Sequence, residues 1–290
     1  MTRHLRGAGP PWYMEGTAEL LGTHHWSEGK LTLGYNPSSK EEVPFWGRVK
    51  IIRDEYAAQR GMLLTDIMKY DAHAHLKNEP YGWCWGAAAF FDSHPLTRKA
   101  FRELPKNASD RSIDFSRKFH EQLQADWPAI LEDWQLFILN CDYGYDFARS
   151  AVIRKAEVIA IPAEGATVTV AADRGWQSTG LKVEAGKTYS LSATGRYQVA
   201  QKPKPWLCEP GGVTIHYHQN WPLGMLIASV GDVEDPTQPV TPLSRFSTVG
   251  TATELVPDSS GTLYLCINEA SSGLADNQGS LSVKIAPQAK

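Results

Sequence analysis

Oxygen-bearing side chains gather near the C-terminus, between two strand-like runs. Glu269, Asp276 and Asn277 follow the apolar run 261–267 and precede the alternating run 280–285, which predicts a polar turn on a hairpin. Calcium takes six to eight hard oxygens at roughly 2.3–2.6 Å, and the Gly273 carbonyl is a further unobstructed donor. These residues predict a calcium site. The alternative is a surface turn in which Asx and Gly residues serve conformation only.

Four stretches resemble the PA-IL-like (LecA-like) calcium-dependent, galactose-binding lectins: residues 176–187, 189–194, 224–231 and the loop 268–280. The resemblance implies a β-sandwich with calcium held by the side chains of Glu269, Asp276 and Asn277 and the carbonyls of Gly273 and Val199. Glu269 stands where the family has Asp, which adds a methylene. Asp276 stands where the family has Asn, and the added negative charge should tighten cation binding.

The segment from Trp206 to Trp221 contains His216, His218 and Gln219, residue types that these lectins use to bind a sugar hydroxyl. The resemblance therefore implies a carbohydrate partner of galactose type, and an extracellular or periplasmic location. The two tryptophans that flank the segment can either stack on a sugar ring or belong to the core. Both readings remain open from the sequence.

Composition limits the class of protein. The chain has 290 residues, 42% hydrophobic and 21% charged, with a formal net charge of −3. These values favour one large or two ordinary globular domains, and they argue against nucleic acid or an anionic membrane as partner. No apolar run reaches transmembrane length, and the N-terminus lacks the apolar region of a signal peptide. The four cysteines predict buried free thiols, with a Cys208–Cys266 disulfide as the alternative.

Hydrophobic periodicity divides the chain into a helical and a β-rich part, an α+β multidomain organisation. Residues 1–150 predict an α-helical domain, and residues 158–290 predict an all-β sandwich. A shift in composition at residues 150–157 marks the boundary. The expected helices cover residues 11–21, 44–60, 64–70, 79–92, 95–104, 112–124 and 127–139.

Two acidic residues lie one turn apart on the first expected helix. Glu15 and Glu19 would share a face, and by themselves they indicate a solvated helix surface, as Tyr81 indicates an interfacial tyrosine. Residues 12–18 nevertheless resemble the third-ligand helix of gluzincin zinc metallopeptidases, and residues 79–88 resemble the Pro-Tyr helix of the aminopeptidase type. The resemblance implies that Glu15 ligates zinc, that Glu19 holds a ligand histidine and that Tyr81 stabilises an oxyanion.

The His-Glu-x-x-His motif of that family is absent from the sequence. Catalytic zinc needs three protein ligands, so Glu15 alone cannot hold the ion. The His24–His25 and His73/His75 pairs are more typical of surface residues than of a substitute site. The resemblance thus covers the C-terminal part of a peptidase domain. We expect this chain to be inactive, with zinc bound only where a His-Glu-x-x-His segment is supplied.

Three hypotheses of function follow. In the first, a calcium-dependent, lectin-like sandwich is fused to an incomplete and inactive metallopeptidase-like domain. In the second, the chain is the C-terminal part of an active zinc metallopeptidase, and the sandwich directs it to glycan. In the third, the sandwich is a calcium-free structural module. The sequence predicts neither the glycan nor the oligomeric state.

Overall fold

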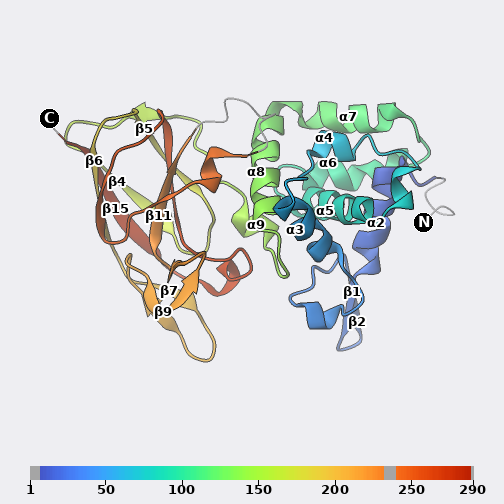
Figure 1. Cartoon of the computed structure of the whole chain (residues 1–290), viewed down its shortest axis with the longest axis horizontal. Coiled ribbons are helices and arrows are strands. Elements are labelled where there is room, and N and C mark those ends of the chain that lie inside the picture. The colour runs from blue at the N-terminus through green and yellow to red at the C-terminus, as the bar shows by residue number, and fades with distance from the viewer. Residues whose placement is uncertain (1–6, 232–239, 289–290) are drawn as a thin grey trace. The chain divides into compact units, whose positions relative to one another are not determined.

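A computed structural model describes residues 7–231 and 240–288, which divide into two compact units (Figure 1). The helical unit comprises residues 7–148, and the sandwich comprises residues 149–231 and 240–288. The predicted fold class, a helical domain followed by a β-sandwich, is confirmed. Across the described ranges, no helix has both the length and the hydropathy needed to cross a membrane.

The helices of the helical unit follow the predicted periodicity closely. They are α2 (Pro11–Gly22), α3 (Arg48–Ala57), α4 (Leu64–Ile67), α5 (Glu79–Ser93), α6 (Arg98–Glu103), α7 (Ile113–Leu123) and α8 (Trp127–Leu139), with α9 (Phe147–Ser150) at the boundary. The prediction that a helix begins at Pro44 is wrong. The Trp46 N–H donates to the Val43 carbonyl at 3.0 Å, which closes a turn there, and the helix begins only after Gly47.

Helix α2 packs closely against α5, and aromatic rings fill the core beside it. A Cβ added at Gly16 would lie 2.5 Å from the carbonyl oxygen of Cys84, so only glycine allows this approach. Trp12 is fully buried, stacks on Phe119 and donates its indole N–H to the Ser116 hydroxyl at 2.8 Å. Burial of the largest side chain is therefore combined with a satisfied donor.

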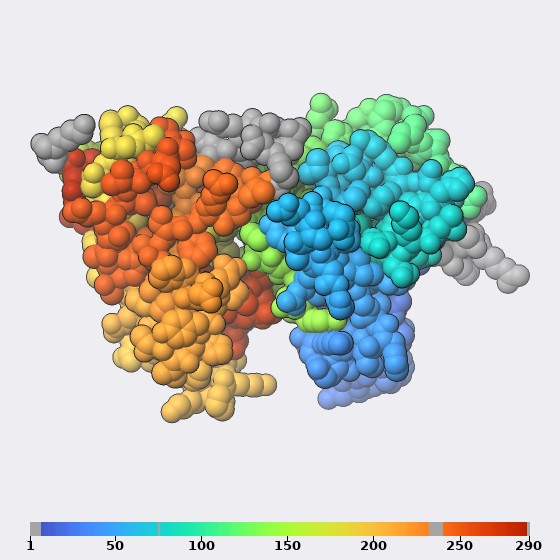
Figure 2. Space-filling model, in the orientation of Figure 1, coloured from blue at the N-terminus to red at the C-terminus, as the bar shows by residue number. Residues whose placement is uncertain are grey.

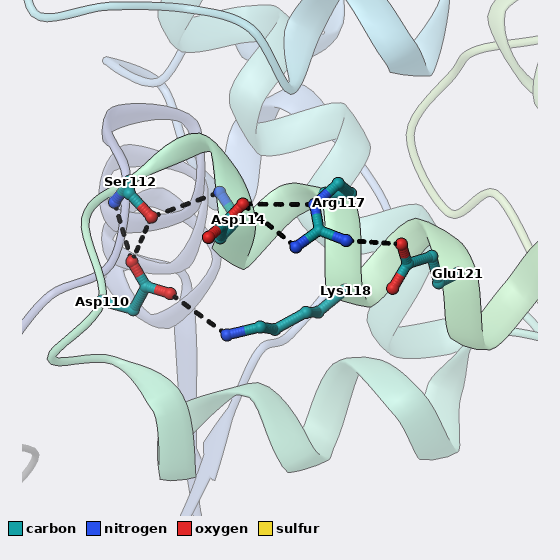
Figure 3. Close-up of polar contacts among 6 residues, drawn as sticks. All are labelled: Asp110, Ser112, Asp114, Arg117, Lys118 and Glu121. Carbon is teal, nitrogen blue, oxygen red and sulfur yellow. Dashed lines mark hydrogen bonds and ion pairs between the residues drawn. The ribbon is translucent and has the colours of Figure 1, made fainter.

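Helix α7 shows why its predicted start is correct. The Ser112 hydroxyl accepts a hydrogen bond from the Asp114 N–H at 3.2 Å, as an N-cap residue does, and itself donates to Asp110 at 2.6 Å (Figure 3). Arg117 then pairs with Asp114 one turn back and with Glu121 one turn on. These ion pairs are exposed, so they support the helix only weakly.

A hairpin that the sequence reasoning missed joins α2 to α3. Strands β1 (His24–Ser27) and β2 (Lys30–Leu33) are linked by Glu28 and Gly29, whose φ values of 51° and 76° define a type I′ turn. Trp26 lies opposite Leu31 and is 66% exposed. In Figure 2 this hairpin forms the lower end of the helical unit.

The sandwich has two sheets with a shared core. One sheet has the order β12-β11-β14-β5-β3 and the other the order β13-β6-β15-β4. Inward side chains of both sheets meet, for example Leu265 of β14 and Val283 of β15. The strands are β3 (Ile159–Ala160), β4 (Ala166–Ala171), β5 (Gln177–Val183), β6 (Tyr189–Thr194), β11 (Leu226–Val230), β12 (Ser247–Thr248), β13 (Ala252–Leu255), β14 (Gly261–Ile267) and β15 (Ser280–Pro287).

Two small antiparallel pairs lie between β6 and β11 in the chain. They are β7 (Tyr197–Ala200) with β8 (Trp206–Cys208), and β9 (Val213–His218) with β10 (Trp221–Leu223). The second pair turns through Gln219 and Asn220, with φ values of 49° and 66°. Cys208 and Cys266 are both free and buried, as are the other cysteines, so the disulfide alternative is wrong.

Candidate functional site

The loop that joins β14 to β15 carries the predicted calcium ligands and lies beside β7 (Figure 1). Gln198 of β7 and Gln278 of the loop exchange two backbone hydrogen bonds, at 2.9 and 3.1 Å. The loop contains a short 3₁₀ turn, η6 (Leu274–Asp276). Its polar residues are therefore fixed against a strand that is distant in sequence.

The Glu269 carboxylate lies directly against Gly273. A Cβ at Gly273 would stand 2.6 Å from Glu269 Oε1, although the glycine φ of −90° is open to any residue. A larger residue at 273 would therefore displace the Glu269 carboxylate, with no conflict in the backbone. Burial raises the pKa of Glu269 to about 7, and the nearby charge of Asp276 adds to the effect, against a hydrogen bond from the Ala270 N–H.

Asp276 joins the loop to β7 through both its side chain and its backbone. Its Oδ2 accepts a hydrogen bond from the Gln201 N–H at 2.9 Å, and its carbonyl accepts one from Gln198 Nε2 at 2.8 Å. Val199, the predicted carbonyl ligand, lies between these two partners, where the register of β7 against β8 shifts. The predicted ligands from the loop and from β7 are therefore neighbours.

Asn277 is 4% exposed and is only half satisfied. Its Nδ2 donates to the Ala172 carbonyl at 3.0 Å, which fixes the orientation of the amide. Its Oδ1 is buried, and within residues 7–231 and 240–288 it has no hydrogen-bond partner. An unpaired buried oxygen costs about 1–3 kcal/mol, and a cation or hydrogen-bond donor at this oxygen would offset that cost.

These oxygens suit a hard cation better than a transition metal. The set combines two carboxylates, Glu269 and Asp276, with the Asn277 amide and backbone carbonyls, which is the donor chemistry of calcium. In the part of the chain that the structure describes, no group of three or more His, Cys, Asp or Glu residues could hold a metal ion. A site here would depend on the amide and carbonyl oxygens as well as on the acids.

The residues predicted from sequence to contact a sugar, His216, His218 and Gln219, lie on the β9–β10 hairpin and not in the loop 268–280. Asn268, which the sequence reasoning missed, connects the two. It is 2% exposed, and its Nδ2 lies within 3.1 Å of the carbonyls of His218, Trp221 and Pro222. Because Glu269 is the next residue, the hairpin is tied directly to the start of the loop.

The two tryptophans predicted to flank the sugar-binding segment differ in exposure. Trp206 packs partly buried against the sandwich core, with its ring edge-on to His216 at 6.1 Å, whereas Trp221 is 43% exposed. Burial lowers the pKa of His218, so its imidazole is neutral at pH 7 and offers both a donor and an acceptor. Of the two tryptophans, Trp221 is the more exposed.

In the helical unit, Glu19 and Tyr81 meet through Arg48. The arginine donates to both oxygens of Glu19, from Nε at 2.8 Å and Nη2 at 2.7 Å, and its guanidinium lies 5.4 Å from the centre of the Tyr81 ring. The Trp46 indole donates to the same carboxylate at 3.3 Å. Sequence reasoning had singled out Glu19 and Tyr81 but not the cation between them.

Glu15 is half-buried on the same helix as Glu19. Burial raises the pKa of the Cys84 thiol, and the charges of Glu15 and Glu19 raise it further, which places both acids near α5. No set of companion ligands surrounds Glu15 in the described residues.

Comparisons with known proteins complete the description. No protein-family model matches this chain, and neither does any curated protein. A solved structure described as the N-terminal domain of EclA, a PllA-like lectin, is similar with 19% sequence identity and a TM-score of 0.33. The match covers 42% of this chain and 95% of that one. At this TM-score the likeness carries no argument, so function must be inferred from the loop and the hairpin themselves.

Proposed function

We propose that the sandwich is a calcium-dependent carbohydrate-binding module. The calcium ion would be held by the side chains of Glu269, Asp276 and Asn277 and by the carbonyls of Gly273 and Val199. The sugar would bind at the same ion, beside the β9–β10 hairpin. The helical unit is peptidase-like in sequence but acts without peptidase chemistry.

One observation carries the calcium proposal: the buried, unpartnered Oδ1 of Asn277 in the loop that also buries Glu269. Desolvation penalises a carboxylate that has no cation to offset it, and here a second acid raises the penalty. A divalent cation would offset the desolvation of Glu269, the repulsion between Glu269 and Asp276, and the unpaired oxygen of Asn277. It would do so because it pairs with both acids and with that oxygen. This combination favours a bound cation over an ordinary surface turn.

The carbohydrate proposal follows from the coordination number. The proposed protein ligands are fewer than the six to eight oxygens that calcium takes, so positions remain for water or for sugar hydroxyls. His218 and Gln219, on the hairpin tied to the loop by Asn268, are suited to the other hydroxyls of the same sugar. Galactose is the sugar that the sequence resemblance favours.

Arg48 is the reason to propose that the helical unit is not a peptidase. It occupies both oxygens of Glu19, which the sequence resemblance assigns to a ligand histidine. Adding zinc to this chain should therefore produce no peptide hydrolysis, measured with fluorogenic aminopeptidase substrates. Turnover that disappears in Glu15→Ala would refute this part of the proposal.

Calcium titration of the chelator-treated protein by calorimetry tests the main proposal. The wild-type chain should bind calcium, and Asp276→Ala should lose most of that binding because it removes a ligand and a charge. Asp258→Asn, which alters an exposed acid of the same sandwich, is the matched control and should behave like wild type. A glycan array with and without calcium then tests the sugar. Absence of calcium binding in the wild-type chain would refute the calcium-dependent sugar site.

A further inference from the structure

We propose that the exposed ring of Trp221 is the apolar wall of the sugar subsite, and that the ligand is a neutral pyranoside whose ring presents a patch of C–H groups. This inference rests on the proposed calcium-dependent function and adds the part of the sugar that the hairpin would contact, its C–H face. It also assigns a specificity role to a residue outside the calcium loop. His218 is its polar neighbour on the same face.

Exposure is the first step of the argument. Trp221 leaves 43% of its surface in contact with solvent, while the neighbouring Trp206 is packed against the core and Trp176 is 9% exposed. This exposure leaves the ring accessible to a ligand, and its position beside the loop 268–280 distinguishes it from the exposed Trp26 of the helical unit. Figure 2 shows the segment that contains this hairpin, coloured gold to orange, at the surface of the sandwich.

The hairpin holds the ring in a defined position. Trp221 is paired with His218 across a two-residue turn, and cross-strand partners place their side chains on the same face. The Trp221 carbonyl accepts a hydrogen bond from Asn268 Nδ2 at 3.1 Å, and so does the His218 carbonyl at 2.9 Å. Both ends of the turn are thus fixed by one buried amide.

The link between this hairpin and the loop 268–280 points to a sugar as the ligand of the exposed ring. Asn268 contacts Trp221 directly, and its backbone continues into Glu269, with about 3.8 Å between the two Cα atoms. A pyranose whose hydroxyl oxygens coordinate the proposed calcium ion would extend from Glu269 toward the hairpin. The face combines an aromatic ring with a neutral imidazole, which suits a sugar with one apolar and one polar side.

The test compares Trp221→Ala, Trp221→Phe and a control, Tyr217→Ala. Tyr217 is 57% exposed on the same hairpin, but it pairs with Pro222 and therefore lies on the opposite face. Calcium affinity is measured first, by calorimetry without sugar. Binding to immobilised galactosides, glucosides and mannosides is then measured at saturating calcium.

We expect all three variants to bind calcium like wild type. Trp221→Ala should lose about tenfold in pyranoside affinity, while Trp221→Phe and Tyr217→Ala stay within about threefold of wild type. Pyranoside binding by Trp221→Ala at the wild-type level, with calcium binding intact, would overturn the inference and leave the calcium-lectin proposal standing. A wild-type chain that binds calcium but none of the sugars would overturn both.

Discussion

At the scale of single residues, Gly273 leaves space for the carboxylate of Glu269, a proposed calcium ligand. Gly273→Ala would bring a methyl group to 2.6 Å from Glu269 Oε1. The flexible carboxylate would move away, so we expect calcium affinity to fall about tenfold while the calcium-free melting temperature hardly changes. Gly211→Ala is the control, since the nearest atom to its new Cβ is 4.0 Å away. Equal calcium affinity in both variants would contradict the proposed ligand set.

Glu269 makes calcium binding depend on pH. Its carboxylate must be ionised to bind the ion, and burial raises its pKa to about 7. Apparent calcium affinity should therefore rise about tenfold between pH 6 and pH 8, with proton release on binding. Calorimetry in two buffers of different ionisation enthalpy measures both effects. A pH-independent affinity would show that Glu269 is not a ligand.

The raised pKa of Glu269 also determines how the stability of the calcium-free sandwich changes with pH. Between about 4.5 and about 7 the folded sandwich binds more protons at Glu269 than the unfolded chain does, so its stability falls as pH rises through this window. The contribution is roughly 3 kcal/mol, and Glu269→Gln should remove it. Urea denaturation of both proteins at several pH values, each with chelator, provides the comparison.

At the scale of elements, the β9–β10 hairpin depends on one amide. Asn268→Ala would remove the donor shared by three carbonyl oxygens, at 2.9, 3.1 and 3.1 Å. We expect a loss of about 1–3 kcal/mol in the unfolding free energy of the sandwich, because buried acceptors are left unpaired. Urea denaturation measures it. Gln278→Ala, which alters an exposed side chain of the same loop, should cost much less.

Elements that bury one regular face were predictable from the sequence, and those that depend on partners were not. The 3.6-residue pattern located α7, and strict alternation located β15. The β1–β2 hairpin was missed because its apolar residues, Trp26 among them, remain exposed and Glu-Gly is a weak turn signal.

The site was predictable only within its own segment. The oxygen-rich loop 268–280 is visible as a cluster of residue types. Arg48 and Asn268 were missed because their roles arise from contacts with residues 29 to 50 positions away, such as Glu19 and His218. No local pattern reports such contacts, since they are created by the packing of helices and strands.

At the scale of the whole molecule, each unit has a hydrophobic core of its own. Calorimetric melting should therefore show two transitions, and calcium should move only that of the sandwich. Calcium at a hundred times its dissociation constant stabilises the bound form by about 2.7 kcal/mol, which raises the sandwich melting temperature by about 10 °C. The helical transition is the internal reference, and Asp276→Ala should abolish the shift. A calcium shift of both transitions would contradict a site confined to the sandwich.

The position of the loop before β15 also determines how the protein would respond to proteases. β15 pairs with both β4 and β6, so the strand after the loop lies inside its sheet. In chelator, the two half-buried acids should make residues 268–279 open locally and become the first cleavage site of the sandwich, and calcium should protect them. After a single cut, the strand pairs would hold both pieces together. Gel filtration should then still show an intact particle, while denaturing electrophoresis separates the fragments.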